Sequence, residues 1–197
     1  MRVSIRYGFT FLCMPKCAST SIERALRPYC ELVTQGGNVP GTRLKHTNLR
    51  NYKKFLEPFI NTIASEPLET VCLMREPIDW LHSWYRYRKR DEIADTPRST
   101  RGISFDQFCE AYMEGKVKGL GSQYRFITTE DGEIGVDKIF RYEELDKLKQ
   151  YFEEKIGKEI EFPVMNVSPK EERLLSPEVE AKLKEFLKKE YEIYEKL

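Results

Sequence analysis

Short apolar runs alternate with amphipathic segments in the first part of the chain. Two runs of strand-forming residues, 3–7 (VSIRY) and 9–14 (FTFLCM), lie on either side of Gly8 and predict a hairpin or two short strands. Apolar residues at helical spacing follow in 21–30 (SIERALRPYC), and Pro28 marks the expected end of that helix. The chain is therefore expected to begin with strand, loop and helix.

The same alternation continues through the middle of the chain. Residues 48–60 (NLRNYKKFLEPFI) predict a helix that breaks near Pro58, and 69–75 (ETVCLMR) reads as a buried strand because its apolar run is continuous. Pro77 suits the first turn of a helix, so 78–90 (IDWLHSWYRYRKR) is expected to be helical, with aromatic and basic residues interleaved.

The last third adds a strand, 136–142 (VDKIFRY), and three helices, 104–115, 143–157 and 176–197. One face of the final helix is expected to be apolar and to contain Val179, Leu183, Phe186 and Leu187. Since strands alternate with helices, the pattern predicts an α/β fold of three layers, in which helices flank a central, mainly parallel sheet.

Composition narrows the class of protein. A chain of 197 residues suits a single domain over 1–197, and 33 basic residues against 32 acidic ones give a net charge of +1. We therefore expect no nucleic-acid partner and no membrane association, and a cytoplasmic protein, since no segment has the length of a spanning helix. Five cysteines without a C-x-x-C pair and two histidines argue against a zinc site or a disulfide framework.

Residues 14–21 (MPKCASTS) join the second predicted strand to the first helix. Such a loop offers free N–H groups and the positive end of a helix dipole to an anion, and here it adds Lys16 and three hydroxyls. The nucleotide-triphosphate motif G-x-x-x-x-G-K-[ST] is absent. The alternative is structural: Lys16 is a solvated turn residue and the hydroxyls only cap the helix.

Cys17 suggests a second chemistry, because a thiolate at a helix N-terminus is acidified and nucleophilic, as in cysteine-dependent phosphatases. Those enzymes need an arginine six positions after the cysteine, whereas Glu23 stands there and the arginine is Arg24. The spacing argues against a phosphatase.

A second constellation follows the buried strand at 69–75. Arg75 ends that strand, and Ser83 lies about two helical turns further on, so both can face one ligand. The guanidinium of a strand-end arginine can bind a phosphate through two hydrogen bonds. An ion pair between Arg75 and a carboxylate is the equally simple alternative.

Together, residues 13–21 (CMPKCASTS) and 75–83 (REPIDWLHS) resemble the two nucleotide-binding motifs of the sulfotransferases that use 3′-phosphoadenosine 5′-phosphosulfate (PAPS). The first motif, x-P-K-[ST]-G-[GST]-T-[ST], is matched with Cys17 and Ala18 replacing a small polar residue and glycine. The second, R-[ND]-P-x-[DE]-x-x-x-S, is matched with Glu76 at the Asn or Asp position. The resemblance is closest to the carbohydrate-type enzymes and implies a P-loop-like nucleotide-binding fold.

The resemblance also assigns roles within the PAPS site. Lys16 would contact the bridging oxygen and the moving sulfuryl group, and Arg75 and Ser83 would hold the 3′-phosphate. The residues implied to surround the 5′-phosphosulfate are Cys17, Ala18, Ser19, Thr20 and Ser21. The residues implied to contact the adenine or cover the 3′-phosphate are Tyr142, from a Y-E-[DE]-L-like turn, and Ser168 and Lys170, with Arg173 as an alternative.

Sulfuryl transfer to an alcohol also requires a base, and histidine has a suitable pKa. His46 lies between the two motifs, where carbohydrate-type sulfotransferases often carry a histidine, and is the base that the resemblance implies. Its alternative is a cap of the helix near Asn48, and the fallback bases are Glu76 and Asp79. His82 is interpreted as structural or at the surface.

The sequence thus predicts an enzyme that moves a sulfuryl group from PAPS to a hydroxyl of a carbohydrate or small metabolite. Adenosine 3′,5′-bisphosphate is the second product, and no metal is expected, because a sulfuryl group carries less charge than a phosphoryl group. The rivals are an ATP-dependent phosphotransferase and a non-catalytic nucleotide-binding protein. The basic run 84–90 (WYRYRKR) is interpreted as a solvated helix end, rather than as a site for an anionic acceptor or nucleic acid.

Overall fold

The computed structural model describes residues 1–34, 44–165 and 171–197. The chain forms two compact units, and each is described by itself. The first consists of Met1–Met74 and Ser122–Met165 together with Leu197, and the second of Arg75–Gly121 and Asn166–Lys196.

The first unit contains an open five-stranded sheet with the order β3-β1-β2-β4-β5. Its strands are β1 (Arg2–Ser4), β2 (Phe9–Leu12), β3 (Leu32–Val33), β4 (Glu69–Met74) and β5 (Lys138–Arg141). β1 is antiparallel to both β2 and β3, whereas β2 pairs with β4, and β4 with β5, in parallel. The prediction of an α/β fold is confirmed, but the prediction of a mainly parallel sheet is wrong. The sheet is mixed because the tight turn at Gly8 can join only antiparallel neighbours.

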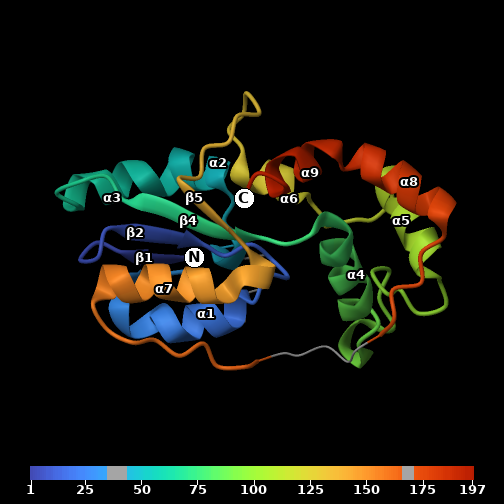
Figure 1. The fold of residues 1–197 in the computed structure, drawn as a ribbon, viewed down its shortest axis with the longest axis horizontal. Coiled ribbons are helices and arrows are strands. Elements are labelled where there is room, and N and C mark those ends of the chain that lie inside the picture. The colour runs from blue at the N-terminus through green and yellow to red at the C-terminus, as the bar shows by residue number, and fades with distance from the viewer. Residues whose placement is uncertain (35–43, 166–170) are drawn as a thin grey trace. The chain divides into compact units, whose positions relative to one another are not determined.

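Helices cover both faces of this sheet (Figure 1). They are α1 (Ser19–Leu26), α2 (Leu49–Asn51), α3 (Glu57–Ile63), α6 (Gln123–Ile127) and α7 (Leu145–Ile156). Phe9 and Phe11 point toward α7, where their rings lie 4.9 and 5.9 Å from that of Phe152. Thr10, between them, points to the other face and shares a 3.2 Å hydrogen bond with the hydroxyl of Tyr52. Strand alternation thus builds two cores, one on each face.

The segment at 48–63 departs from its predicted break at Pro58. A π-helical turn, η3 (Tyr52–Leu56), joins α2 to α3, and the amide of Glu57 donates to the carbonyl of Tyr52. Pro58 then falls in the first turn of α3, where its missing N–H costs little. The helical path therefore continues through the proline.

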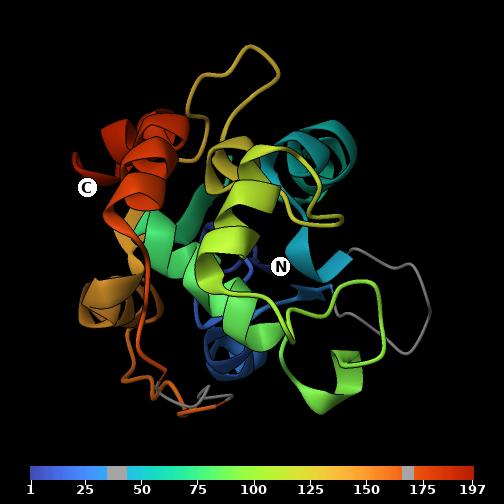
Figure 2. The ribbon, with the colours of Figure 1, turned by 90° about the vertical axis from the view of Figure 1, so that its right-hand side faces the viewer.

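The second unit is helical among its described residues. Its helices are α4 (Pro77–Tyr87), α5 (Phe105–Met113), α8 (Pro177–Phe186) and α9 (Lys188–Tyr194). α5 packs against α4 and α8 (Figure 2), and the capping box of Ser104 and Gln107 fixes where it begins. The core between α4 and α5 is aromatic: the ring of Phe105 lies 4.9 Å from His82 and 5.3 Å from Tyr85.

The predicted C-terminal helix is divided at Leu187 into α8 and α9. The bend changes which side chains face the core. Of the four residues predicted to share one apolar face, Val179, Leu183 and Leu187 are buried, whereas Phe186 is 53% exposed and its ring lies 5.8 Å from that of Tyr112.

Four short 3-10 helices complete the described secondary structure: η1 (Arg27–Tyr29), η2 (Leu44–His46), η4 (Asp91–Ile93) and η5 (Tyr142–Glu144). Within the three described ranges, every helix is too short or too polar to cross a bilayer.

Candidate functional site

The loop after β2 has an unusual backbone. Lys16 and Ala18 both lie in the left-handed region, with φ of 67° and 47°, although neither is glycine. Side chains are disfavoured there by about 1–2 kcal/mol per residue, and such conformations are concentrated at functional sites. Ala18 stands at the position where the sulfotransferase motif has glycine, so the backbone has the conformation that this glycine would favour.

This loop leads directly into the N-terminus of α1. The amides of Ser21 and Ile22 donate to the carbonyl of Ala18, at 3.0 and 3.2 Å, and start the helical hydrogen bonding. The amides of Ser19 and Thr20 come before these donors, at the positive end of the helix dipole. Backbone N–H groups in a loop with left-handed residues followed by a helix form a concave anion site.

The hydroxyls of this stretch do not cap α1. Ala18 is the N-cap residue and makes no side-chain capping bond, while Ser19, Thr20 and Ser21 form the first turn. Cys17 is only 1% exposed, and Ser19 and Ser21 are also buried. The capping role considered for these hydroxyls is therefore not what the described structure shows.

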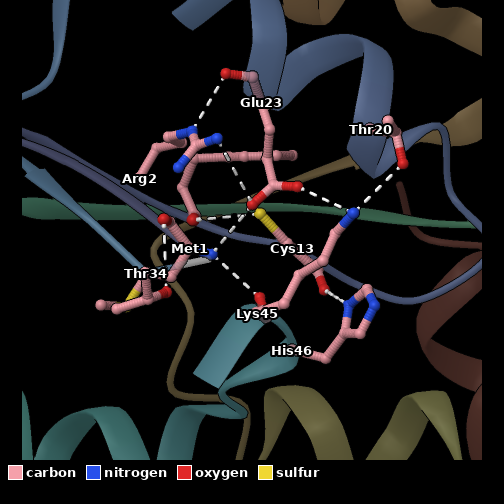
Figure 3. A network of polar contacts seen from close by, with 9 residues as sticks. Met1, Arg2, Cys13, Thr20, Glu23, Thr34, Lys45 and His46 are labelled. Atoms are coloured by element: carbon pink, nitrogen blue, oxygen red, sulfur yellow. Dashed lines mark hydrogen bonds and ion pairs between the residues drawn. The ribbon is translucent and has the colours of Figure 1, made fainter. Parts of the chain in front are cut away.

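A polar network links α1 to the segment that carries His46 (Figure 3). The ammonium of Lys45 lies 3.1 Å from the Thr20 hydroxyl and 3.1 Å from Oε2 of the buried Glu23. Glu23 also pairs with the amino group of Met1 at 3.3 Å and with Arg2 at 3.9 Å. Burial by itself would raise the pKa of Glu23, but the surrounding cations, first the Met1 amine and then Lys45, hold it below its ordinary value.

His46 is anchored by its ring to the loop (Figure 3). Its Nδ1 lies 2.7 Å from the carbonyl oxygen of Cys13, the residue that follows β2. A carbonyl can only accept, so Nδ1 carries the proton and Nε2 of the neutral ring is the acceptor. His46 is solvent-exposed, yet desolvation by the protein around it lowers the pKa of the imidazole. The hydrogen bond to the Cys13 carbonyl opposes this shift, and the charge of Lys45 adds to it. A neutral imidazole with a fixed tautomer is the form that can accept a proton.

Two residues near His46, Asn48 and Cys13, narrow its role. Asn48 caps α2 by accepting from the amide of Asn51 at 3.0 Å, so His46 is not that cap. Burial raises the pKa of the Cys13 thiol to about 12, so the thiol stays protonated at neutral pH. The main-chain carbonyl of Cys13 accepts from His46, and its thiol lies beside the Met1 amine and Glu23.

In the second unit, Arg75 forms the carboxylate pair that was its alternative role. Its Nε and Nη2 lie 2.7 and 2.6 Å from the same oxygen of Asp79, one turn into α4. Ser83 is buried in α4. The side chain of Arg75 is only 11% exposed and that of Asp79 is 35% exposed, so this pair is partly withdrawn from water.

The fallback base Glu76 is held by structural contacts. Its side chain caps α4 by accepting from the amide of Asp79 at 2.6 Å, and it also accepts from the Tyr191 hydroxyl and from Arg173 at 3.3 Å. The carboxylate of Asp79, the other fallback base, forms an ion pair with Arg75. His82 is 3% exposed and stacks on Tyr85, which agrees with a structural role.

The remaining sequence-derived residues are placed only in part. Tyr142 follows directly after β5 and is partly exposed. Ser168 and Lys170 lie outside the described residues. Lys45 was missed, because nothing in the sequence links it to Glu23 and Thr20; its only signal was its place beside His46.

A search of the described residues finds no group of three or more His, Cys, Asp or Glu side chains arranged around a metal site. Comparisons of the chain with protein-family models, with curated proteins and with solved structures gave no match.

Proposed function

We propose that this protein is a sulfotransferase that moves a sulfuryl group from PAPS to a hydroxyl of a carbohydrate or small metabolite, on a P-loop-like version of its α/β fold. The observation that carries the proposal is the loop at 14–18. It joins strand β2 to helix α1 with left-handed residues at Lys16 and Ala18, in the stretch that resembles the 5′-phosphosulfate motif.

The leaving-group side of the reaction is assigned to this loop. The amides at the start of α1 and the hydroxyls of Ser19, Thr20 and Ser21 would bind the 5′-phosphate, with Cys17 and Ala18 lining it. Lys16 would stabilise the negative charge that develops on the phosphate as the sulfur–oxygen bond to it breaks. Lys45, 3.1 Å from Thr20, adds a second positive charge at this end of α1.

The acceptor side is assigned to His46. Its Nε2 would take the proton from the acceptor hydroxyl while the acceptor oxygen forms its bond to sulfur. The hydrogen bond from Nδ1 to the Cys13 carbonyl holds the ring in the tautomer that this step needs.

The nucleotide residues outside the first loop are assigned by resemblance alone. Arg75 and Ser83 would hold the 3′-phosphate, Tyr142 would contact the adenine, and Ser168 and Lys170 would cover the phosphate. Binding would then require the Arg75 guanidinium to exchange Asp79 for phosphate.

The decisive experiment compares thermal stabilisation by adenosine 3′,5′-bisphosphate with that by ATP and magnesium. A ligand present at 100 times its Kd stabilises the folded state by about 2.7 kcal/mol, which corresponds to a rise in Tm of about 5–10 °C for a chain of this size. We expect this shift with the bisphosphate. A preference for ATP and magnesium would establish the phosphotransferase instead.

Transfer from PAPS to a panel of hydroxyl acceptors tests catalysis. We expect Lys16→Ala to reduce turnover by about 10²-fold or more, whereas Lys158→Ala, at an exposed lysine in the same unit, should leave it unchanged. Bisphosphate binding without any transfer would indicate a non-catalytic nucleotide-binding protein.

A further inference from the structure

The basic run 84–90, at the C-terminal end of α4, contains a buried guanidinium group. Arg88 is the C-cap residue of α4, and it is only 5% exposed. The sequence interpretation of a solvated helix end is therefore wrong for this residue. A buried guanidinium is costly unless hydrogen bonds and an opposite charge compensate it.

The contacts of Arg88 supply little of that compensation. Its Nη2 donates to the carbonyl of Lys118 at 2.9 Å, and its Cζ lies 5.8 Å from the centre of the Trp84 ring. A guanidinium has five N–H donors, so one carbonyl and one aromatic face leave donors of Arg88 without a partner among the described residues, available to water or to a ligand.

A second arginine approaches the same turn. The Cζ and Nη2 atoms of Arg98 lie 3.9 Å from the point where a side chain would begin at Gly119, the residue after Lys118. Burial and then the positive charge of Arg98 lower the pKa of Arg88. The guanidinium of Arg88 is thus bonded to the Lys118–Gly119 turn, and that of Arg98 lies close to the same turn.

Among the described residues, no carboxylate forms an ion pair with Arg88 or Arg98, although the neighbouring Lys89 and Arg101 pair with Glu171 and Asp91. The segments 35–43 and 166–170, outside the described residues, contain no Asp or Glu. Two guanidinium groups at one turn, neither of them ion-paired among the described residues, are arranged to accept an external anion.

We propose that Arg88, Arg98 and the Lys118–Gly119 turn bind a sulfate or carboxylate group of the acceptor, so that the acceptor is an anionic saccharide. Guanidinium groups bind both oxyanions through paired hydrogen bonds, and a pair of them favours a charged acceptor over a neutral one. The role as an acceptor site rests on the proposed function, whereas anion binding by this pair does not.

Isothermal titration calorimetry of the full chain, without PAPS, tests this site. The probe is a sulfated hexasaccharide that contains uronic acid, compared with its desulfated, carboxyl-reduced form and with sodium sulfate. We expect the anionic hexasaccharide to bind, the neutral form not to bind, and sulfate to bind more weakly than the hexasaccharide. Saturation by sulfate with no gain from the saccharide would overturn the saccharide assignment.

Two variants test whether binding depends on Arg88 and Arg98 specifically or only on the positive charge of the surface. Arg98→Ala, at an exposed residue, should weaken hexasaccharide binding at least 10-fold. Arg101→Ala makes the same change in net charge, but its guanidinium is already paired with Asp91, so it should change the affinity less than twofold. Equal losses in both variants would contradict the inference.

Arg88→Met tests the buried charge itself. Because a buried cation without an ion pair is costly, replacing it with methionine should keep or raise the Tm of the free protein. The same change removes the guanidinium, so hexasaccharide binding should be lost. A lower Tm with unchanged binding, in a variant whose circular dichroism is native, would assign Arg88 a purely structural role. Tighter binding of a single-stranded RNA than of the hexasaccharide would also contradict the saccharide assignment.

The proposed function can fail separately. Hexasaccharide binding that depends on Arg98, in a protein that does not bind adenosine 3′,5′-bisphosphate, would contradict the sulfotransferase proposal and leave the anion site standing. If the protein binds the nucleotide and transfers the sulfuryl group, but Arg98→Ala binds the hexasaccharide with unchanged affinity, the sulfotransferase proposal stands and the anion site is contradicted.

Discussion

At the scale of single residues, one hydrogen bond fixes the tautomer of the His46 imidazole. The Cys13 carbonyl accepts from Nδ1 at 2.7 Å, which leaves Nε2 as the basic nitrogen. Desolvation lowers the imidazole pKa below its ordinary value, so the ring is neutral at physiological pH. The residue is therefore in its proton-accepting form before any substrate arrives.

We expect sulfuryl transfer to depend on pH through His46. The rate should be constant near pH 7 and fall on acidification with a midpoint below pH 6.5, because the folded-state pKa is lowered. His46→Asn keeps a donor for the Cys13 carbonyl but removes the base, so turnover should drop by about 10²-fold or more and lose this acid limb. Steady-state kinetics from pH 5 to 8 provide the measurement.

Binding of adenosine 3′,5′-bisphosphate serves as the control for this variant, and its affinity should be unchanged. An acid limb that persists in His46→Asn would assign the titration to another group and remove His46 from the mechanism.

At the scale of elements, the candidate site is built on strand β2, the loop that follows it and helix α1. Sequence patterns predicted this order, and the structure confirms it, because strand propensity and helical periodicity are local properties. The left-handed backbone at Ala18 was not predictable from its residue type, since alanine disfavours it. The connection between two fixed elements imposes this conformation.

Replacing Ala18 by glycine tests that strain. Glycine removes a conformational cost of about 1–2 kcal/mol in the folded state and adds an entropy cost of about 0.5–1 kcal/mol relative to alanine. We expect Ala18→Gly to be neutral or to stabilise by up to about 1.5 kcal/mol in urea unfolding. Ala25→Gly, inside α1, is the matched control and should destabilise by about 0.5–1 kcal/mol. Equal losses at both positions would contradict the left-handed conformation of Ala18.

Pro58 shows where a local rule fails at this scale. Proline ends a regular α-helix because it lacks one donor and its ring clashes with the preceding turn. The π-turn at Tyr52–Leu56 shifts the register so that Pro58 occupies a first-turn position. Tyr52, buried and bonded to Thr10 of the sheet, fixes the segment through a contact that spans 42 residues.

At the scale of the whole molecule, each unit contains a buried group with a displaced pKa. In the first unit, the pKa of Glu23 is lowered, so its contribution to stability is present above its unfolded value and is lost as the pH falls below about 4.5. In the second, burial among aromatic rings lowers the pKa of His82 to about 4. Its neutral form stabilises the fold, and this stability is lost between about pH 6.5 and pH 4.

Mild acid should therefore loosen the second unit before the Glu23 network titrates. We expect hydrogen exchange in α4 and α5, corrected for its intrinsic pH dependence, to be faster at pH 5 than at pH 7. His82→Phe keeps an aromatic ring between Tyr85 and Phe105 and should abolish the difference. An unchanged pH effect in this variant would exclude His82 as its cause.

Local sequence patterns by themselves determined most strands and helices, their caps and the strand–loop–helix order that bears Lys16. They also marked His46, although only through resemblance to a family. Tertiary structure decided that β1 also pairs with β3, that Phe186 is exposed and that Lys45 joins Thr20 to Glu23. It also decided that Arg88 is buried without an ion pair to a carboxylate among the described residues. Propensity and periodicity act over a few residues, whereas burial and charge pairing depend on side chains far apart in sequence that only the folded chain brings together.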